Sequence, residues 1–241
     1  MRLALLLVAS LGIVAATGCG PRLKVDSARM KPIETIAAVT FVANRTVKAP
    51  STGGLDASPS DPTMSTAEQV FALGIPAFME AMQRTERFAF VDNETVLGAT
   101  AYRDFPVLTG SNAGNAQLAA GWRYVTPQDE EKIAALLKEI DADAALITYW
   151  RFSLDTHTRG PGGEIATPRA HMRAWLIGRD GKIVADDEFD VVSDEIIAVY
   201  SQRYDGRVLP PLYLDPIEII AVRLMADLSN ARSKAREKTE K

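Results

Sequence analysis

The sequence predicts an α/β (α+β) fold, in which a mixed sheet of about five strands carries packed helices in a single domain. Three patterns lead to this prediction. Strand-like and helix-like segments alternate over residues 35–150, which favours parallel neighbouring strands. Three strand-like segments then follow one another over residues 144–191, which favours an antiparallel meander. Apolar residues recur at helical spacing between the strand-like segments and near the C-terminus.

Each predicted element depends on a local pattern. Residues 35–42 are apolar and rich in β-branched side chains, which is typical of a buried strand. Thr126 and Pro127 provide the N-cap and first position of a helix, and Asp215 and Pro216 do the same for the last helix. In chain order we predict a strand at 35–42, a helix at 65–82 kinked or split at Pro76, a strand at 87–91, a short helix at 92–97, a helix at 126–140, strands at 144–155, 166–178 and 182–191 with a tight turn at Asp180-Gly181, a short helix at 193–201 and a helix from 215.

The first 18 residues have the pattern of a secretory signal. Arg2 provides a positive start, and an apolar run of 14 residues extends from Leu3 to Ala16. This run is shorter than the roughly 20 apolar residues that span a bilayer. Small residues then lead into Cys19, the one cysteine of the chain. A signal peptide over residues 1–18 is therefore expected.

The segment Ala16-Thr17-Gly18-Cys19 resembles the cleavage motif of bacterial lipoproteins, with Ala16 where leucine is more usual. The resemblance implies that Cys19 becomes the first mature residue, with diacylglycerol on its sulfur and an acyl chain such as palmitate on its nitrogen. Two or more acyl chains anchor a protein stably, whereas one binds only marginally. An ordinary cleaved signal followed by a chance cysteine is the alternative. The predicted organisation is a signal peptide at 1–18, a lipidated tether at 19–34, the α/β domain at 35–231 and a charged flexible tail at 232–241.

Composition narrows the class of partner. Loss of residues 1–18 removes Arg2 and leaves 26 basic against 31 acidic residues, a formal charge of −5. Because sequence-independent nucleic-acid binding needs a basic surface, we expect no nucleic-acid partner. No cysteine follows Cys19, so internal disulfides are excluded and stability must come from an ordinary core.

Motifs for catalysis or metal binding are lacking in the sequence. His157 and His171 are the two histidines. Antiparallel pairing could bring them near one another, but neither has a ligand spacing such as HxxxH. The acidic residues between 186 and 195 alternate along a predicted strand instead of converging in one tight loop, as calcium requires. The sequence has no GxSxG, GxGxxG or GxxxxGK[ST] motif. We therefore expect a non-catalytic protein without metal or cofactor.

Residues 99–125 form the candidate binding loop. They interleave Tyr102, Phe105, Trp122 and Tyr124 with glycines and polar residues. Such aromatics either line a binding groove or fasten a loop as a lid on the domain, and the packed lid is the commoner outcome. Both interpretations stay open at this point.

The order of elements, with the apolar strand at 35–42 and the helix-then-strand segment at 133–150, resembles the periplasmic α/β domain of curli-secretion lipoproteins, the N-terminal domain of TolB and lipoprotein activators of peptidoglycan synthases. The resemblance implies a membrane-anchored envelope lipoprotein that acts as a non-catalytic adaptor or assembly factor, docking another envelope protein through a sheet edge or the aromatic loops. Gly20 stands where aspartate commonly retains lipoproteins at the inner membrane, which implies the outer membrane, facing the periplasm.

Two other functions remain open. One is a subunit of an outer-membrane secretion pore of the curli type, for which residues 146–155 and 170–178 come nearest to membrane-crossing strands. Arg173 and the acidic residues of 186–190 argue against that pair. The other is a solute-binding lipoprotein that uses the aromatics of residues 99–125, which would need a concave pocket.

Overall fold

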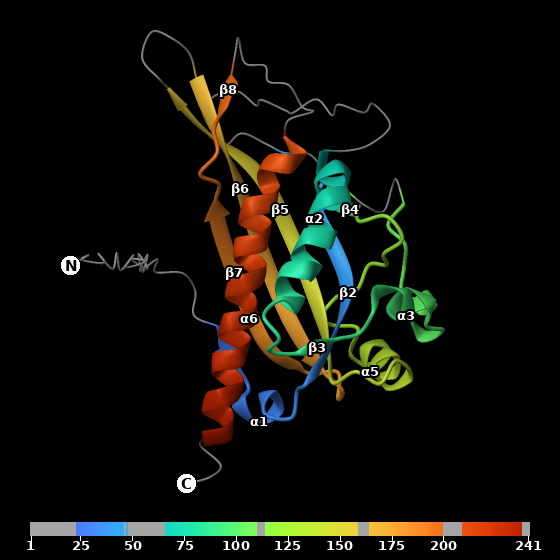
Figure 1. The fold of residues 1–241 in the computed structure, drawn as a ribbon. Coiled ribbons are helices and arrows are strands. Elements are labelled where there is room, and N and C mark those ends of the chain that lie inside the picture. The colour runs from blue at the N-terminus through green and yellow to red at the C-terminus, as the bar shows by residue number, and fades with distance from the viewer. Residues whose placement is uncertain are drawn as a thin grey trace, which may run out of the picture.

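The computed structural model describes residues 23–45, 47, 66–109, 114–158, 164–199 and 209–237. It shows a twisted mixed sheet with two long helices lying side by side across one face (Figure 1). These are α2 (Thr66–Gln83) and α6 (Leu214–Glu237). The predicted α/β class and mixed sheet are therefore confirmed. The other helices are α1 (Ser27–Met30), α3 (Asn93–Gly98) and α5 (Glu130–Glu139), with 3-10 turns η1 (Ala101–Asp104) and η3 (Pro210–Tyr213).

The described strands follow the order β1-β7-β6-β5-β2-β3 across the sheet. Strand β2 is parallel to β3 and β5, and β5, β6 and β7 form the antiparallel meander. Two further short strands pair with β2 and β6. The bounds are β1 Lys24–Val25, β2 Thr35–Asn44, β3 Ala89–Phe90, β4 Ala116–Leu118, β5 Ala144–Thr158, β6 Glu164–Gly178, β7 Ile183–Val192 and β8 Ile197–Val199. The five predicted strands are present, and β1, β4 and β8 are additional.

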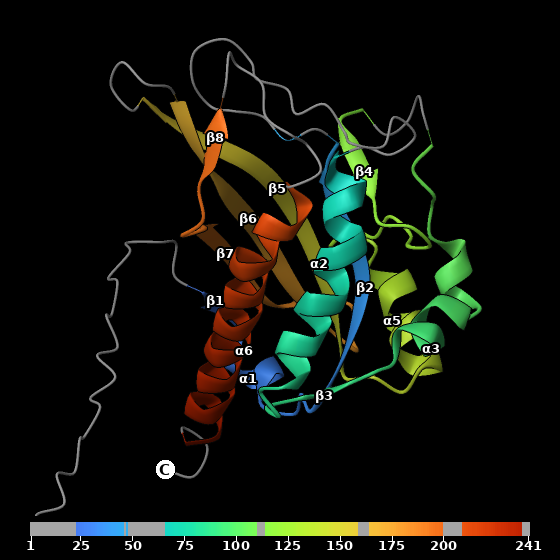
Figure 2. The same cartoon turned by 45° about the horizontal axis from the view of Figure 1, so that its top comes forward.

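The main core lies between the sheet and α2 with α6 (Figure 2). At its centre, Phe41 of β2 contacts Phe78 of α2 and Trp122 edge-to-face, and Trp150 of β5 contacts Phe78 in the same way. The ring centroids of these pairs are 4.7 to 5.9 Å apart. Each such pair contributes about 0.5–1.5 kcal/mol beyond area burial. The smaller elements α3, η1 and α5 pack against the opposite face beside β2 and β5.

The folded domain begins before residue 35, which corrects the predicted tether at 19–34. Strand β1 pairs with β7, and Met30 and Ile33 are fully buried. It also extends past residue 231, which corrects the predicted flexible tail, because α6 continues to Glu237 with Ala235 buried. The local sequence at both ends of the domain is polar, which suggested flexible segments. Tertiary contacts that involve β7 and α6 order these ends instead.

Three local predictions also change. Helix α2 is one helix that contains Pro76, so of the predicted kink or split at this residue the split is wrong. Helix α5 begins at Glu130, with Asp129 at the N-cap position, instead of at Thr126. The Asp129 carboxylate accepts hydrogen bonds from the backbone N–H and the hydroxyl of Thr126, both at 2.8 Å, which closes a turn before the helix. The predicted short helix at 193–201 is wrong: residues 197–199 form β8 on β6, where β-branched side chains suit a strand.

Candidate functional site

Three of the four aromatic residues in the candidate binding loop lie in the core. Tyr102 and Phe105 are each 1% exposed and Trp122 is 7% exposed. The Tyr102 hydroxyl donates to the carbonyl of Val39 and accepts from the backbone N–H of Arg123, both at 2.8 Å. Burial raises the pKa of this hydroxyl. These three residues therefore fasten the loop to the domain, as the packed-lid interpretation describes, and do not line an open groove.

A small pocket lies between α2 and the residues after β4. Phe71, Ile75 and Trp122 line it, with Glu68 at one side, and its volume is about 190 Å³. Pockets for drug-sized ligands typically measure about 300–1,000 Å³. This pocket is below that range, so it gives little support to the solute-binding alternative.

The fourth predicted aromatic residue lies on the sheet face opposite α2 and α6. Half-buried Tyr124 stacks on Tyr149 of β5 at 6.1 Å, Tyr149 meets Trp175 of β6 edge-on at 5.1 Å, and the Arg173 guanidinium lies 4.7 Å from the Trp175 ring centroid. Burial, with a contribution from Tyr124, raises the pKa of the Tyr149 hydroxyl. The result is a rigid row of rings across neighbouring strands.

Ion pairs between β6 and β7 continue on the same face. Arg173 contacts Asp186 at 2.9 Å and Arg169 contacts Asp190 at 3.2 Å, while His171 pairs with Glu188. The Asp186 carboxylate raises the pKa of Arg173. Three of the acidic residues between 186 and 195 thus pair with basic side chains of β6 diagonally across the two strands, an arrangement that stabilises antiparallel pairing. Asp187 differs, because it is buried opposite Ala174.

The hairpin register separates the two histidines. Backbone pairing places His171 opposite Arg151, whereas His157 lies opposite Ile165, so pairing does not bring them together as expected. The side chain of His157 lies outside the described residues. Within the described part of the chain, no group of three His, Cys, Asp or Glu side chains is placed to hold a metal ion.

Beyond Asp186, the edge of β7 has no paired strand in the part of the chain that the structure describes. Among the described residues, β1 is the strand that pairs with this edge, and it covers Ala185 and Asp186. Because backbone groups alternate in direction along a strand, those of Glu188, Asp190 and Val192 point away from β6. The N–H of Glu188 donates to the neighbouring carboxylate of Asp187 at 2.8 Å.

Asp187 is a buried acid beside this edge. It is 7% exposed and alternates with buried Ala185 and Phe189, on the side of β7 that packs against α6. Desolvation, with the nearby charge of Asp227 on α6, raises its pKa to about 6. Burial also raises the pKa of Asp227, against the opposing effect of Arg223. Two acids therefore share the β7–α6 interface.

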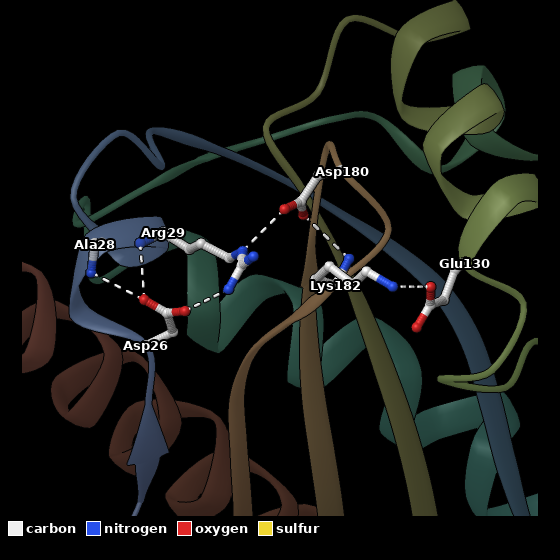
Figure 3. Close-up of polar contacts among 6 residues, drawn as sticks. All are labelled: Asp26, Ala28, Arg29, Glu130, Asp180 and Lys182. Carbon is white, nitrogen blue, oxygen red and sulfur yellow. Dashed lines mark hydrogen bonds and ion pairs between the residues drawn. The ribbon is translucent and has the colours of Figure 1, made fainter.

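A polar network holds the N-terminal elements to the domain (Figure 3). The guanidinium of Arg29 on α1 bridges Asp26 and Asp180, and it donates to Asp180 at 2.8 Å. This contact lowers the pKa of the Asp180 carboxyl, which also accepts a backbone hydrogen bond from Lys182 at 3.1 Å. The Lys182 ammonium pairs with Glu130 of α5. The β6–β7 turn therefore links α1 to α5.

Comparison with known proteins identifies no family. No protein-family model matches the sequence, and no curated protein matches it. Solved structures that are similar at a distance include the following two. The hypothetical protein CT253 from Chlamydia trachomatis has a TM-score of 0.38 and 9% identity, covering 81% of this chain and 98% of that one. Lipoprotein GNA1162 from Neisseria meningitidis has a TM-score of 0.31 and 15% identity, covering 78% of this chain and 98% of that one. Similarity at this level does not assign a function.

Among the described residues, no helix combines the length and the apolar character that a membrane span requires. Cys19, the predicted lipidation site, and the signal segment lie outside the described residues.

Proposed function

We propose that the protein is a lipid-anchored envelope lipoprotein, attached through Cys19 to the periplasmic face of the outer membrane, whose domain acts as a non-catalytic adaptor or assembly factor. The sequence Ala16-Thr17-Gly18-Cys19 supports the anchor, and Gly20 in place of aspartate supports the outer membrane. The partner in this proposal is another envelope protein.

The observation that carries the proposal is the short distance along the chain between the anchor and the fold. Three residues separate Cys19 from Leu23, where the described domain begins. A chain of that length reaches about 14 Å at full extension, whereas the predicted tether at 19–34 would have reached about 50 Å. This short reach supports an arrangement in which the domain lies at the membrane surface and the β1–β7 edge of the sheet is the part nearest to the anchor.

The accessible surface near that anchor suits contact with a protein. It offers an open strand edge and a sheet face of paired charges and stacked rings, from β5, β6 and β7. Edges and rigid aromatic surfaces of this kind bind polypeptides through backbone hydrogen bonds and side-chain packing.

The test is fractionation of a Gram-negative host that expresses the full chain or its Cys19→Ala variant. We expect the wild type to incorporate labelled palmitate and to fractionate at the density of the outer membrane. The Cys19→Ala variant should do neither. Native mass in mild detergent should then give a monomer or dimer. If the unlabelled variant stays in the membrane fraction, lipid anchoring through Cys19 is refuted. A large urea-resistant ring in the native-mass measurement would favour the secretion-pore alternative over the adaptor.

A further inference from the structure

We propose that the partner docks as an added β strand on the open edge of β7 over residues 188–192, and that this strand alternates basic and apolar residues. The inference deepens the adaptor function proposed above and depends on it for its biological role. The binding chemistry itself can be tested without the membrane.

The edge has the backbone groups that strand addition requires. Asp26 donates to the carbonyl of Val184 at 2.8 Å on the β1 side, and Ser193 donates to Pro168 at 2.8 Å on the β6 side. These two bonds set the alternation along β7, so the backbone groups of Glu188, Asp190 and Val192 face outward. The Glu188 N–H already donates to Asp187, so the groups offered to an incoming strand are the Glu188 carbonyl and the N–H and carbonyl groups of Asp190 and Val192. An incoming strand would pair with them as a further strand of the sheet.

Strand β1 shows which residues suit this edge. In its antiparallel pairing, Lys24 lies opposite Asp186 and Val25 lies opposite Ala185. A basic residue thus faces an acid on the outer face of the sheet, and an apolar residue faces the core side. The N-terminal end of β1 points along β7 toward Glu188, so the part of the edge that no described strand covers begins where β1 ends.

The side chains beyond β1 repeat the same alternation. Glu188 and Asp190 are exposed on the outer face, with side chains 42% and 51% exposed. Phe189 and Val191 face the core side, and Val192 is the exposed apolar residue at the end of the strand. Each carboxylate has two oxygens and can accept from a second cation besides its partner on β6. An incoming strand with basic residues opposite the acids and apolar residues between them would complete both faces of the sheet at this edge.

The same features select against a second copy of the chain at this edge. Charged side chains and an inward-pointing charge such as Asp187 are common protections of edge strands against aggregation. Two β7 edges brought together would oppose acid with acid, which destabilises the pair. A basic strand meets no such repulsion, so the edge discriminates between partners.

The first test uses three nine-residue peptides and the full chain in nonionic detergent, with empty micelles as the blank. One peptide alternates lysine and valine, one holds the same residues in two blocks, and one alternates glutamate and valine. Fluorescence anisotropy should show binding of the first peptide at least about tenfold tighter than either control. Equal affinities for the alternating and the block peptide would mean that charge alone drives binding, and this would overturn the proposal. Absence of binding by the alternating peptide would overturn it too.

The second test separates backbone pairing from charge. Asp190→Asn and Asp190→Pro both remove the carboxylate that contacts Arg169, but the proline also removes the outward N–H. The proline variant should bind the alternating peptide about tenfold more weakly than the asparagine variant, with circular dichroism confirming that both are folded. Equal affinities would overturn the proposal.

Hydrogen exchange gives a measurement that needs no variant. The amides of Asp190 and Val192 should become protected when the alternating peptide binds, and unchanged exchange would overturn the proposal. The same measurements on the Cys19→Ala chain keep this outcome separate from the anchor. Peptide binding without membrane attachment would refute the proposed function alone, and membrane attachment without peptide binding would refute this inference alone.

Discussion

Replacement of the buried Asp187 by asparagine is predicted to stabilise the protein at neutral pH. Desolvation is the main cause of the raised pKa of Asp187, and the charges of Asp227, Asp186 and Glu188 add to it. Asparagine has nearly the same shape and keeps an oxygen that accepts the 2.8 Å hydrogen bond from the Glu188 backbone. The substitution therefore removes an unfavourable charge and preserves the local geometry.

The pKa gives the size and the sign of the effect. In the folded chain the pKa of Asp187 is about 6, against 3.8 for an ordinary aspartate. Each unit corresponds to about 1.4 kcal/mol, so the ionised form lowers the free energy of unfolding by at most about 3 kcal/mol at pH 7.5. Partial relaxation of the site reduces this to about 1–2 kcal/mol. The folded state binds the proton more tightly, so stability is highest below about pH 4 and falls as the pH rises through about 6.

Urea unfolding followed by tryptophan fluorescence at pH 4 and pH 7.5 measures this difference. The Asp187→Asn variant should unfold at higher urea than the wild type at pH 7.5 and at about the same urea at pH 4. Asp190→Asn is the matched control, because it removes an exposed carboxylate from the same strand, and it should give no stabilisation. A gain of equal size at both pH values, or a loss at pH 7.5, would refute the reasoning.

Two other substitutions test the loop and the turn. Tyr102→Phe should lower the free energy of unfolding by about 1–3 kcal/mol because two backbone partners of the hydroxyl lose their hydrogen bond, and an unchanged midpoint in calorimetry would contradict this. Gly181→Ala should lower it by about 2 kcal/mol or more, since φ is +75° and a Cβ would lie 2.5 Å from the carbonyl oxygen of Glu130. Gly121→Ala, at φ +84° with open space around it, is the control and should lose less; equal losses would show that the contact with Glu130 is unimportant.

The long elements could be predicted because their pattern is repeated many times. The last helix begins near Asp215 as expected, and its apolar stripe is entirely buried. Helical periodicity over several turns leaves little ambiguity about which face packs on the sheet. The buried residues of the predicted stripe are Ile217, Ile220, Ala221, Leu224, Met225 and Leu228.

The short elements could not be predicted, because they depend on distant neighbours. Strand β1 consists of Lys24 and Val25, and it exists through pairing with residues of β7 more than 150 positions later. Nothing local distinguishes this segment from a tether. For the same reason Ser193 suggested a helix cap, although the chain that follows pairs with β6 as β8.

The candidate site was predictable in kind but not in place. A sheet edge was expected as a docking surface, yet the identity of the edge depends on strand order, which a single sequence does not specify. The row of Tyr124, Tyr149 and Trp175 combines residues from three separate segments and needs the β5–β6 register to be recognised. The aromatic spacing within residues 99–125 favoured a packed lid over a binding groove, and the structure shows three of the four aromatics buried.

Hydrogen bonds between the last helix and segments early in the chain determine when the fold can be completed. The Arg232 guanidinium donates to the carbonyl of Ile33, 199 positions earlier in the chain, and to the carbonyl of Arg87. Strand β2 likewise waits for β5 to pair beside it. During synthesis, the chain therefore has no complete core until α6 has left the ribosome. Any shorter chain that ends before α6 would leave the α6 side of the sheet uncovered, so the domain folds as one unit and only once its C-terminal helix is available.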